Sequence, residues 1–271
     1  MLTIQNYVRA QSLQQAYDLN QKKSSRILGG MMWLKMQNNT VNTAIDLCDL
    51  GLGAIEETAD AFSIGAMVTL RQLETHPGLN AYTRGAMARA VESIVGVQFR
   101  NMATVGGSIF GRFGFSDVLT IFLAMDTQVE LFGAGKIPLE QFVEMPQDRD
   151  LLVRLIVKKR PGRFVYQSMR NTRTDLPVLT CAAAELDGAH RVVIGARPAR
   201  AMVLRDEEGL LRESIDLSSA HTFAVWVAGH TPTGSNVRGS AAYRTRLARV
   251  LTERALLELG EPQQGGSEDG D

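Results

Sequence analysis

The sequence predicts an α+β fold with two domains. Helical and strand-like stretches alternate along the 271 residues without the regular rhythm of a doubly wound parallel sheet. Apolar residues make up 45% of the chain, which is enough to bury a substantial core. Two glycine pairs, Gly29 with Gly30 and Gly106 with Gly107, each follow a short apolar stretch and precede a helical pattern. These pairs therefore mark turns between major elements.

Residues 1–52 are expected to form a small βαβ-like lobe. Ser12 with Gln15 is a capping-box signature and predicts a helix that runs through Leu19. The next segments are predicted as strand, helix and strand, at residues 26–28, 31–36 and 43–47.

Residues 53–160 are expected to form a second lobe. The pattern predicts strands at 54–57, 61–64 and 129–132, and helices near 69–73 and 85–95. Residues 117–125 are apolar almost all round, which predicts a buried helix. The basic, breaker-rich turn at 158–163 then ends a first domain of residues 1–160, although a solvated hairpin would contain the same residues.

Residues 161–260 are expected to form a C-terminal domain, an antiparallel sheet covered by helices. Its predicted strands are 164–169, 178–185 and 190–196, and its predicted helices are 218–227 and 240–259. Residues 261–271 are polar, acidic and rich in glycine, so we expect a disordered tail there.

Composition argues against several classes of partner. The 29 basic and 29 acidic residues cancel, so no electrostatic footprint for nucleic acid or an anionic membrane is visible. No apolar run approaches the roughly 20 residues of a membrane span, and the N-terminus lacks a signal-peptide core, so we expect a cytoplasmic protein. Cys48 and Cys181 are far apart and the four histidines are dispersed, so no metal site is expected and any iron–sulfur cluster must sit on another chain.

The glycine pairs are suited to bind a diphosphate. Glycine accepts positive φ and has no side chain, so consecutive amides can turn toward an anion at the start of a helix. Around the second pair, Arg100, Asn101, Thr104 and Ser108 add a cation, an amide and two hydroxyls, all good partners for phosphate oxygens. The plainer interpretation is that both pairs are ordinary strand-to-helix turns.

A family resemblance sharpens this interpretation. The segment Arg100 to Ser108 resembles the Arg-Asn-x-Ala-Thr-x-Gly-Gly-Asn/Ser motif of the FAD-binding subunits of molybdenum hydroxylases, the family of xanthine dehydrogenase, aldehyde oxidoreductases and aerobic carbon monoxide dehydrogenase. The turn at 28–32, Ser116-Asp117 and the segment 238–244 also resemble family motifs, and the likeness runs nearly end to end. It implies the PCMH-type FAD-binding fold, with two α/β lobes and a C-terminal domain of antiparallel sheet and helices.

The resemblance also implies a set of residues that bind FAD noncovalently. Asp117 is expected to accept a hydrogen bond from the ribityl chain, although it also suits the start of a helix. Phe110 is expected near the flavin ring, although a core position is equally compatible. The full set is Leu28, Gly29, Gly30, Met31, Met32, Thr104, Gly106, Gly107, Ser108, Phe110, Asp117, Leu151 and Gln167.

Two positions depart from the family pattern. Met31 and Met32 stand where the family usually has a polar residue able to donate to phosphate, so only backbone donors remain. Gln167 lies near the place of a common family lysine, and the sequence leaves open whether Arg170 supplies that charge.

The expected function is electron transfer within a complex. The resemblance implies that electrons arrive from [2Fe-2S] clusters of a small subunit, beside a large molybdopterin-binding subunit, and leave from FAD to NAD or another acceptor. Two alternatives remain: a self-contained flavin oxidoreductase of the same fold, for which no acid, base or covalent-linkage residue is visible, and a non-catalytic assembly subunit that has lost FAD.

Overall fold

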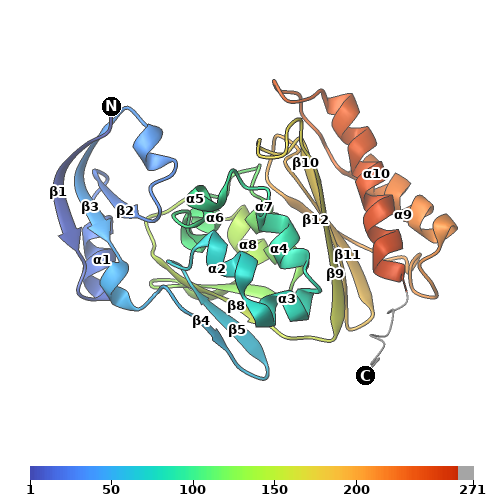
Figure 1. The fold of residues 1–271 in the computed structure, drawn as a ribbon, viewed down its shortest axis with the longest axis horizontal. Helices are drawn as coiled ribbons and strands as arrows, with labels where there is room; N and C mark the ends of the chain where they lie inside the picture. Colours follow the sequence, from blue (N-terminus) through green and yellow to red (C-terminus); the bar gives the residue numbers. More distant parts are fainter. Residues whose placement is uncertain (262–271) are drawn as a thin grey trace, which may run out of the picture.

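A computed structural model describes residues 1–261, in which three separate sheets follow one another along the chain. In Figure 1 the N-terminal sheet lies at one end, the middle sheet and its helices come next, and the C-terminal sheet with its two long helices lies at the other end. The predicted α+β class is therefore confirmed.

The N-terminal lobe is a parallel three-stranded sheet in the order β1-β3-β2. Its elements are β1 (Thr3–Arg9), α1 (Leu13–Asn20), β2 (Ser25–Leu28), the 3-10 turn η1 (Leu34–Met36), β3 (Thr40–Asp46) and the 3-10 turn η2 (Cys48–Leu50). Ser12 caps α1 by accepting a hydrogen bond from the Gln15 amide, as predicted. Only η1 forms within 31–36, so the longer helix predicted there is wrong.

The middle lobe combines a five-stranded sheet, in the order β4-β5-β8-β6-β7, with a group of short helices. The strands are β4 (Ile55–Glu57), β5 (Ala61–Gly65), β6 (Thr127–Leu131), β7 (Gly135–Pro138) and β8 (Leu152–Lys158). The helices are α2 (Leu70–Thr75), α3 (Pro77–Thr83), α4 (Ala86–Val91), α5 (Val97–Arg100), α6 (Val105–Phe110), α7 (Asp117–Ala124) and α8 (Leu139–Glu144). Every residue of α7 is buried, as its apolar composition predicted.

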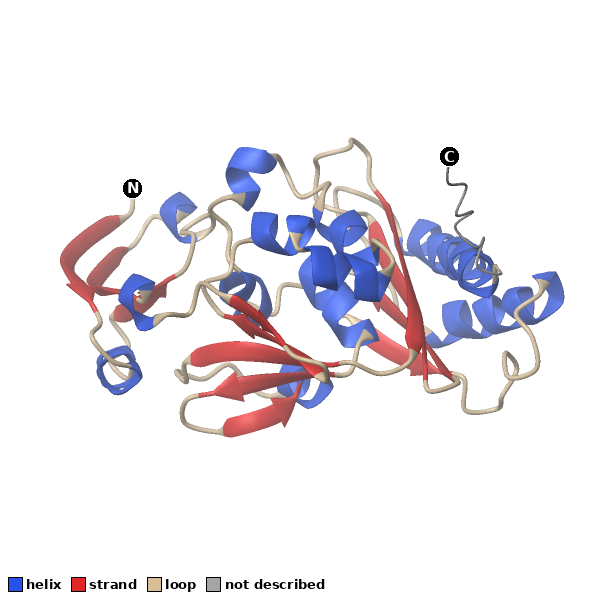
Figure 2. Cartoon of the chain, turned by 60° about the horizontal axis from the view of Figure 1, so that its bottom comes forward, coloured by secondary structure: helices blue, strands red, loops and turns tan. Residues whose placement is uncertain are grey.

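The C-terminal unit is an antiparallel sheet in the order β12-β11-β10-β9, built from β9 (Gly162–Met169), β10 (Leu179–Leu186), β11 (Ala189–Gly195) and β12 (Met202–Arg205). Helices α9 (Leu217–His230) and α10 (Ala241–Gly260) cover one face, and helices of the middle lobe cover the other (Figures 1 and 2). Tyr166 and Ala182 therefore join the core of the middle lobe, while Val165 and Cys181 pack toward α9 and α10. The tail predicted at 261–271 lies, apart from Glu261, outside the described residues.

No helix within the described residues is both long and apolar enough to cross a membrane. Likewise, residues 1–261 contain no group of three or more His, Cys, Asp or Glu side chains that could hold a metal ion.

Candidate functional site

A two-chambered cavity lies where the N-terminal lobe meets the middle helices. The first chamber has a volume of about 440 Å³ and the second about 420 Å³. Both glycine pairs contribute to its lining. Eight residues line both chambers and so form the boundary between them, which we call the waist: Arg26, Ile27, Gly29, Thr104, Gly107, Phe110, Gly111 and Gln147.

The first glycine pair forms an open loop after β2. A Cβ built on Gly30 would overlap the carbonyl oxygen of Met102, so this position needs glycine for close approach to the middle lobe. Neither glycine of the pair has a positive φ, contrary to the sequence-based expectation; instead Met31 does, at 58°. The backbone amides of residues 29–33 donate no hydrogen bond to any group among the described residues.

The second glycine pair has a different structure. Contrary to the strand-to-helix turn expected from the sequence, this pair does not end a strand. Gly106 and Gly107 lie in the first turn of α6, which Thr104 caps by accepting from the Gly107 amide at 3.2 Å. The amides of Val105, Gly106 and Ser108 donate to the carbonyls of residues 68, 66 and 104. The only strand-like feature that the structure describes at this place is an isolated bridge between Thr104 and Thr69, just before the helix.

The two glycines of the second pair also differ in the space around them. A Cβ on Gly106 would come within 2.7 Å of the Ala66 carbonyl oxygen, so this position is closely packed. A Cβ on Gly107 would meet only the Thr104 hydroxyl, at 3.3 Å. Gly107 therefore lines the cavity, and a Cβ there would have a single tight contact, with the Thr104 hydroxyl.

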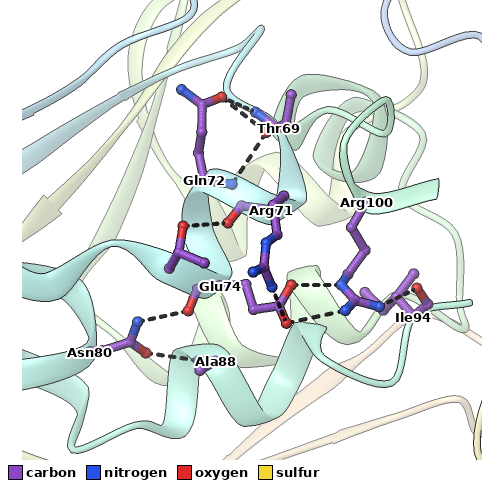
Figure 3. A network of polar contacts seen from close by, with 9 residues as sticks. Thr69, Arg71, Gln72, Glu74, Asn80, Ala88, Ile94 and Arg100 are labelled. Atoms are coloured by element: carbon purple, nitrogen blue, oxygen red, sulfur yellow. Dashed lines mark hydrogen bonds and ion pairs between the residues drawn. The ribbon is translucent and has the colours of Figure 1, made fainter. Parts of the chain in front are cut away.

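Arg100 does not face the cavity, contrary to its expected role as a phosphate partner. Its guanidinium donates to both carboxylate oxygens of Glu74, at 2.7 and 3.1 Å, and to the Ile94 carbonyl at 3.1 Å (Figure 3). Burial alone would raise the pKa of Glu74, but hydrogen bonds from Arg100 and Arg71 outweigh it and hold the pKa below its ordinary value. The buried pair fixes the segment before the second glycine pair to α2.

Asp117 is the first residue of α7, and it lines the first chamber. Ser116 caps the helix by accepting from the Leu119 amide at 3.0 Å, so the capping role considered for Asp117 is wrong. Its Oδ1 accepts from the Tyr166 hydroxyl at 2.5 Å and pairs with Arg170. Burial raises the pKa of Asp117, and Arg170 opposes that rise. Oδ2 has no hydrogen-bond partner outside its own residue among those described, which leaves it available to a ligand.

Two arginines near the waist were not predicted as site residues. Arg26 lines both chambers, and it donates only to the carbonyls of Lys23 and Ser25, at 2.6 and 2.7 Å. Arg149 lines the second chamber and also donates to backbone carbonyls, including that of Ser25 at 2.8 Å. Neither forms an ion pair within residues 1–261. Burial, and then repulsion from Arg26, lowers the pKa of Arg149.

Nearly all predicted site residues converge on the cavity. Gly30, Met31, Met32, Ser108 and Asp117 line the first chamber, and Leu28, Gly106 and Leu151 line the second. Gly29, Thr104, Gly107 and Phe110 line both. Gln167 lies apart from them. Its side-chain amide donates to Glu258 of α10 at 3.0 Å, on the face of the sheet that turns away from the cavity.

Comparison with known families decides the identity of this fold. The sequence model of the family described as "FAD binding domain in molybdopterin dehydrogenase" matches residues 2–159, more than half of the chain. The chain belongs to this family. The match spans the two lobes that enclose the cavity, and it confirms the resemblance identified from the glycine motifs.

Relatives and solved structures extend over nearly the whole chain. The sequence is 27% identical to YgfM of Escherichia coli K12, an uncharacterised protein, over 98% of this chain and 99% of YgfM. It is 26% identical to the nicotine 6-hydroxylase medium subunit of Paenarthrobacter nicotinovorans, over 94% of this chain and 96% of that subunit. Quinoline 2-oxidoreductase from Pseudomonas putida 86 has the same fold, with a TM-score of 0.84 at 22% identity over 94% of this chain and 96% of that one. CO dehydrogenase from Oligotropha carboxidovorans also has this fold, with a TM-score of 0.82 at 23% identity over 95% of this chain and 97% of that one.

Proposed function

We propose that the chain binds one FAD noncovalently, with the diphosphate at the waist between the two chambers. The observation that carries this proposal is the loop at 29–33, which lines the cavity together with Arg26 and whose five amides have no hydrogen-bond partner among the described residues. Free amides and an uncompensated guanidinium are the groups that bind phosphate oxygens. A dinucleotide has one nucleotide half on each side of its diphosphate, and the site has one chamber on each side of its waist.

The protein groups then act by binding and positioning. The first glycine loop and Arg26 hold the diphosphate, and Gly107 leaves the space that it needs. The free Oδ2 of Asp117 accepts a hydrogen bond from a sugar or ribityl hydroxyl, while Tyr166 and Arg170 hold the carboxylate in place. When bound, FAD supplies an acceptor that can take up or release one or two electrons.

We further propose that the chain is an electron-transfer subunit of a molybdenum hydroxylase-type complex. The nicotine 6-hydroxylase relative is named as a medium subunit, which supports a heteromeric assembly with a large molybdopterin subunit and a small [2Fe-2S] subunit. The sequence has only two cysteines, Cys48 and Cys181, too few for a cluster with four cysteine ligands, which supports clusters on another chain. The acceptor that follows FAD is NAD or another oxidant, and the complex operates in the cytoplasm.

The other proposed features concern boundaries and contacts. We propose residues 1–160 as the FAD-binding domain and 161–260 as the C-terminal domain; the family match ends at 159, close to this division.

The basic turn at 158–163 is a weaker candidate for the contact with the iron–sulfur subunit. Lys159 pairs with Glu57, Arg160 with Asp126 and Asp187, and Arg163 with Glu185, so little free positive charge remains for a partner.

Two rival functions use the same fold. A self-contained flavin oxidoreductase would oxidise its substrate without partners. A non-catalytic assembly subunit would bind no FAD, and the apolar side chains of Met31 and Met32 at the first glycine loop are the observation that favours it.

Three measurements on the purified chain separate these functions. Flavin at one per chain, released on denaturation or restored by added FAD, supports the proposal, and a chain that cannot be loaded supports the assembly subunit. Anaerobic mixing with purines and aldehydes should leave the bound flavin oxidised; rapid bleaching by any of them would favour the self-contained oxidoreductase. Co-purification with molybdopterin and iron–sulfur subunits would support the electron-transfer function.

A further inference from the structure

Three aromatic side chains from two lobes meet at the wall of the first chamber. Trp33 follows the first glycine pair, while Phe113 and Phe115 belong to the loop between α6 and α7. The Trp33 ring lies 5.9 Å from Phe113 and 5.4 Å from Phe115, and the two phenylalanine rings stack at 5.2 Å. All three line the chamber, and we refer to them as the aromatic trio.

The loop that carries Phe113 and Phe115 is anchored by the buried side chain of Arg112. Arg112 is only 6% exposed, has a positive φ of 47°, and places its guanidinium 3.9 Å from the centre of the Phe142 ring. It also donates to the Met145 carbonyl at 2.6 Å. A left-handed arginine is a costly conformation, so the surrounding contacts must fix it. The buried arginine therefore anchors the loop in the middle lobe.

The same loop is also tied to the C-terminal unit and to itself. The Ala196 amide donates to the Gly114 carbonyl at 2.7 Å, and the Ser116 amide donates to the Phe113 carbonyl at 3.0 Å. The Phe113 ring lies directly on the backbone of Gly111, where a Cβ would come within 2.5 Å of it. The two stacked rings are thus held in a fixed orientation.

The trio keeps apolar surface exposed at the cavity. Trp33 is 40% exposed and Phe113 is 36% exposed, although both are large aromatic residues. Aromatic side chains stack favourably on the flat faces of heteroaromatic rings. The chamber that they line also contains Asp117, whose Oδ2 has no partner in any other described residue.

We propose that the aromatic trio is a stacking site for a planar heteroaromatic ring. This inference rests on the proposed function, because the ring that the site would take there is the isoalloxazine or the adenine of FAD. Trp33 from the N-terminal lobe and Phe113 from the middle lobe already contact each other, so they would present one continuous aromatic wall to one side of the ring. The trio thereby connects cofactor binding to the contact between the two lobes.

The test uses the full chain, loaded and unloaded, and substitutions that remove an aromatic face but keep apolar bulk. Trp33→Leu and Phe113→Leu should each raise the Kd for FAD by about 10-fold or more, and Trp33→Phe should retain most of the affinity. Met36→Leu, in the same 3-10 turn region, and Trp226→Phe, on α9, are matched controls that should bind as the parent chain does. Urea unfolding of each unloaded variant separates lost binding from lost packing.

Separate titrations with ADP and with riboflavin 5′-phosphate identify the ring. A loss of affinity confined to ADP assigns the adenine to the trio. A loss of affinity confined to riboflavin 5′-phosphate assigns the isoalloxazine, and flavin emission should then increase in Trp33→Leu. Unchanged affinity for FAD in both leucine variants would overturn the stacking site while leaving the proposed function intact. Failure of the parent chain to bind FAD at all would overturn both.

Discussion

The two glycine pairs look alike in the sequence but use their backbones differently. In the first pair the amides of the following loop have no partner among the described residues. In the second pair every amide from Val105 to Ser108 already donates to a protein oxygen. The first pair therefore offers hydrogen-bond donors to a ligand, and the second offers the space created by Gly107.

The difference teaches that a glycine pair predicts close approach more securely than it predicts anion binding. Gly30 and Gly106 are both required because another backbone passes close to them, at Met102 and Ala66 respectively. The two segments even pack against each other, since Gly30 faces the residues that lead into the second pair. Which pair binds phosphate depends on the free amides, and these are set by the fold around each pair.

The largest expected effect is a loss of stability when the ion pair between Glu74 and Arg100, which fixes the segment before the second glycine pair, is removed. Glu74→Gln leaves the buried Arg100 without its carboxylate, so unfolding should become easier by about 3–5 kcal/mol at neutral pH. The pKa of Glu74 is lowered in the folded chain, so its stabilisation is present above the ordinary glutamate pKa of about 4.3 and is lost as the pH falls through the folded value. Urea unfolding from pH 7 to pH 3 should show the two proteins converge in acid. The exposed Glu92→Gln is the control, and a constant difference at every pH would contradict the ion-pair account.

The next largest effect is a loss of stability when the close contact between Gly30 and the Met102 carbonyl is disturbed. Gly30→Ala should destabilise the chain by about 3 kcal/mol, because its methyl group overlaps the Met102 carbonyl. Gly53→Ala lies at the start of the middle lobe, where a Cβ meets no atom within 4 Å, and it should leave the urea midpoint nearly unchanged. Equal midpoints for the two variants would mean that the lobes do not meet at Gly30.

Gly107→Val should separate binding from stability. Its first added carbon would meet one atom, the Thr104 hydroxyl at 3.3 Å, which has to shift by a few tenths of an ångström, so the unfolding midpoint should fall less than in Gly30→Ala. The branched side chain would fill the waist, and the Kd for FAD should rise at least about 100-fold, or about 2.7 kcal/mol. Flavin titration together with urea unfolding measures both. Retained flavin at the parental stoichiometry would exclude the waist as the diphosphate site.

The smallest predicted effect concerns the cation beside the first pair. Arg26→Gln should raise the Kd for FAD by about 10-fold, the size expected from one charge-assisted hydrogen bond. Lys23→Gln removes the same charge from an exposed position nearby and should have little effect. If the two variants weaken binding equally, the contribution of Arg26 is general electrostatic attraction and not a direct contact.

The sequence predicted most elements with strong apolar patterns. The buried helix at 117–125 and three of the four strands of the C-terminal sheet were recognised because their residues are apolar and their turns contain glycine or proline, whereas the four-residue β12 was missed. β1 was missed, because it is an exposed edge strand whose polar residues give no alternating pattern. The short helices α3, α5 and α8 were missed because fewer than two turns give too little periodicity.

The residues of the site were predicted from sequence motifs. The errors concern side chains whose hydrogen-bond or ion-pair partners are set by the fold. Twelve of the thirteen predicted residues line the cavity, and Gln167 does not, because the alternation of a strand directs its side chain toward α10. Arg100 was expected at the phosphate because its carboxylate partner, Glu74, lies 26 residues away and gives no local signal. Arg26 was missed for the same reason: its lack of an ion-pair partner is a property of the fold.

Amide hydrogen exchange with and without FAD tests the central claim most directly. The free amides of residues 29–33 should exchange quickly in the unloaded chain and become protected when FAD binds, because they then donate to the diphosphate. The amides of residues 105–108 should change little, since they are hydrogen-bonded already. Protection that appears at 105–108 but not at 29–33 would contradict the account and assign the diphosphate to the second glycine pair.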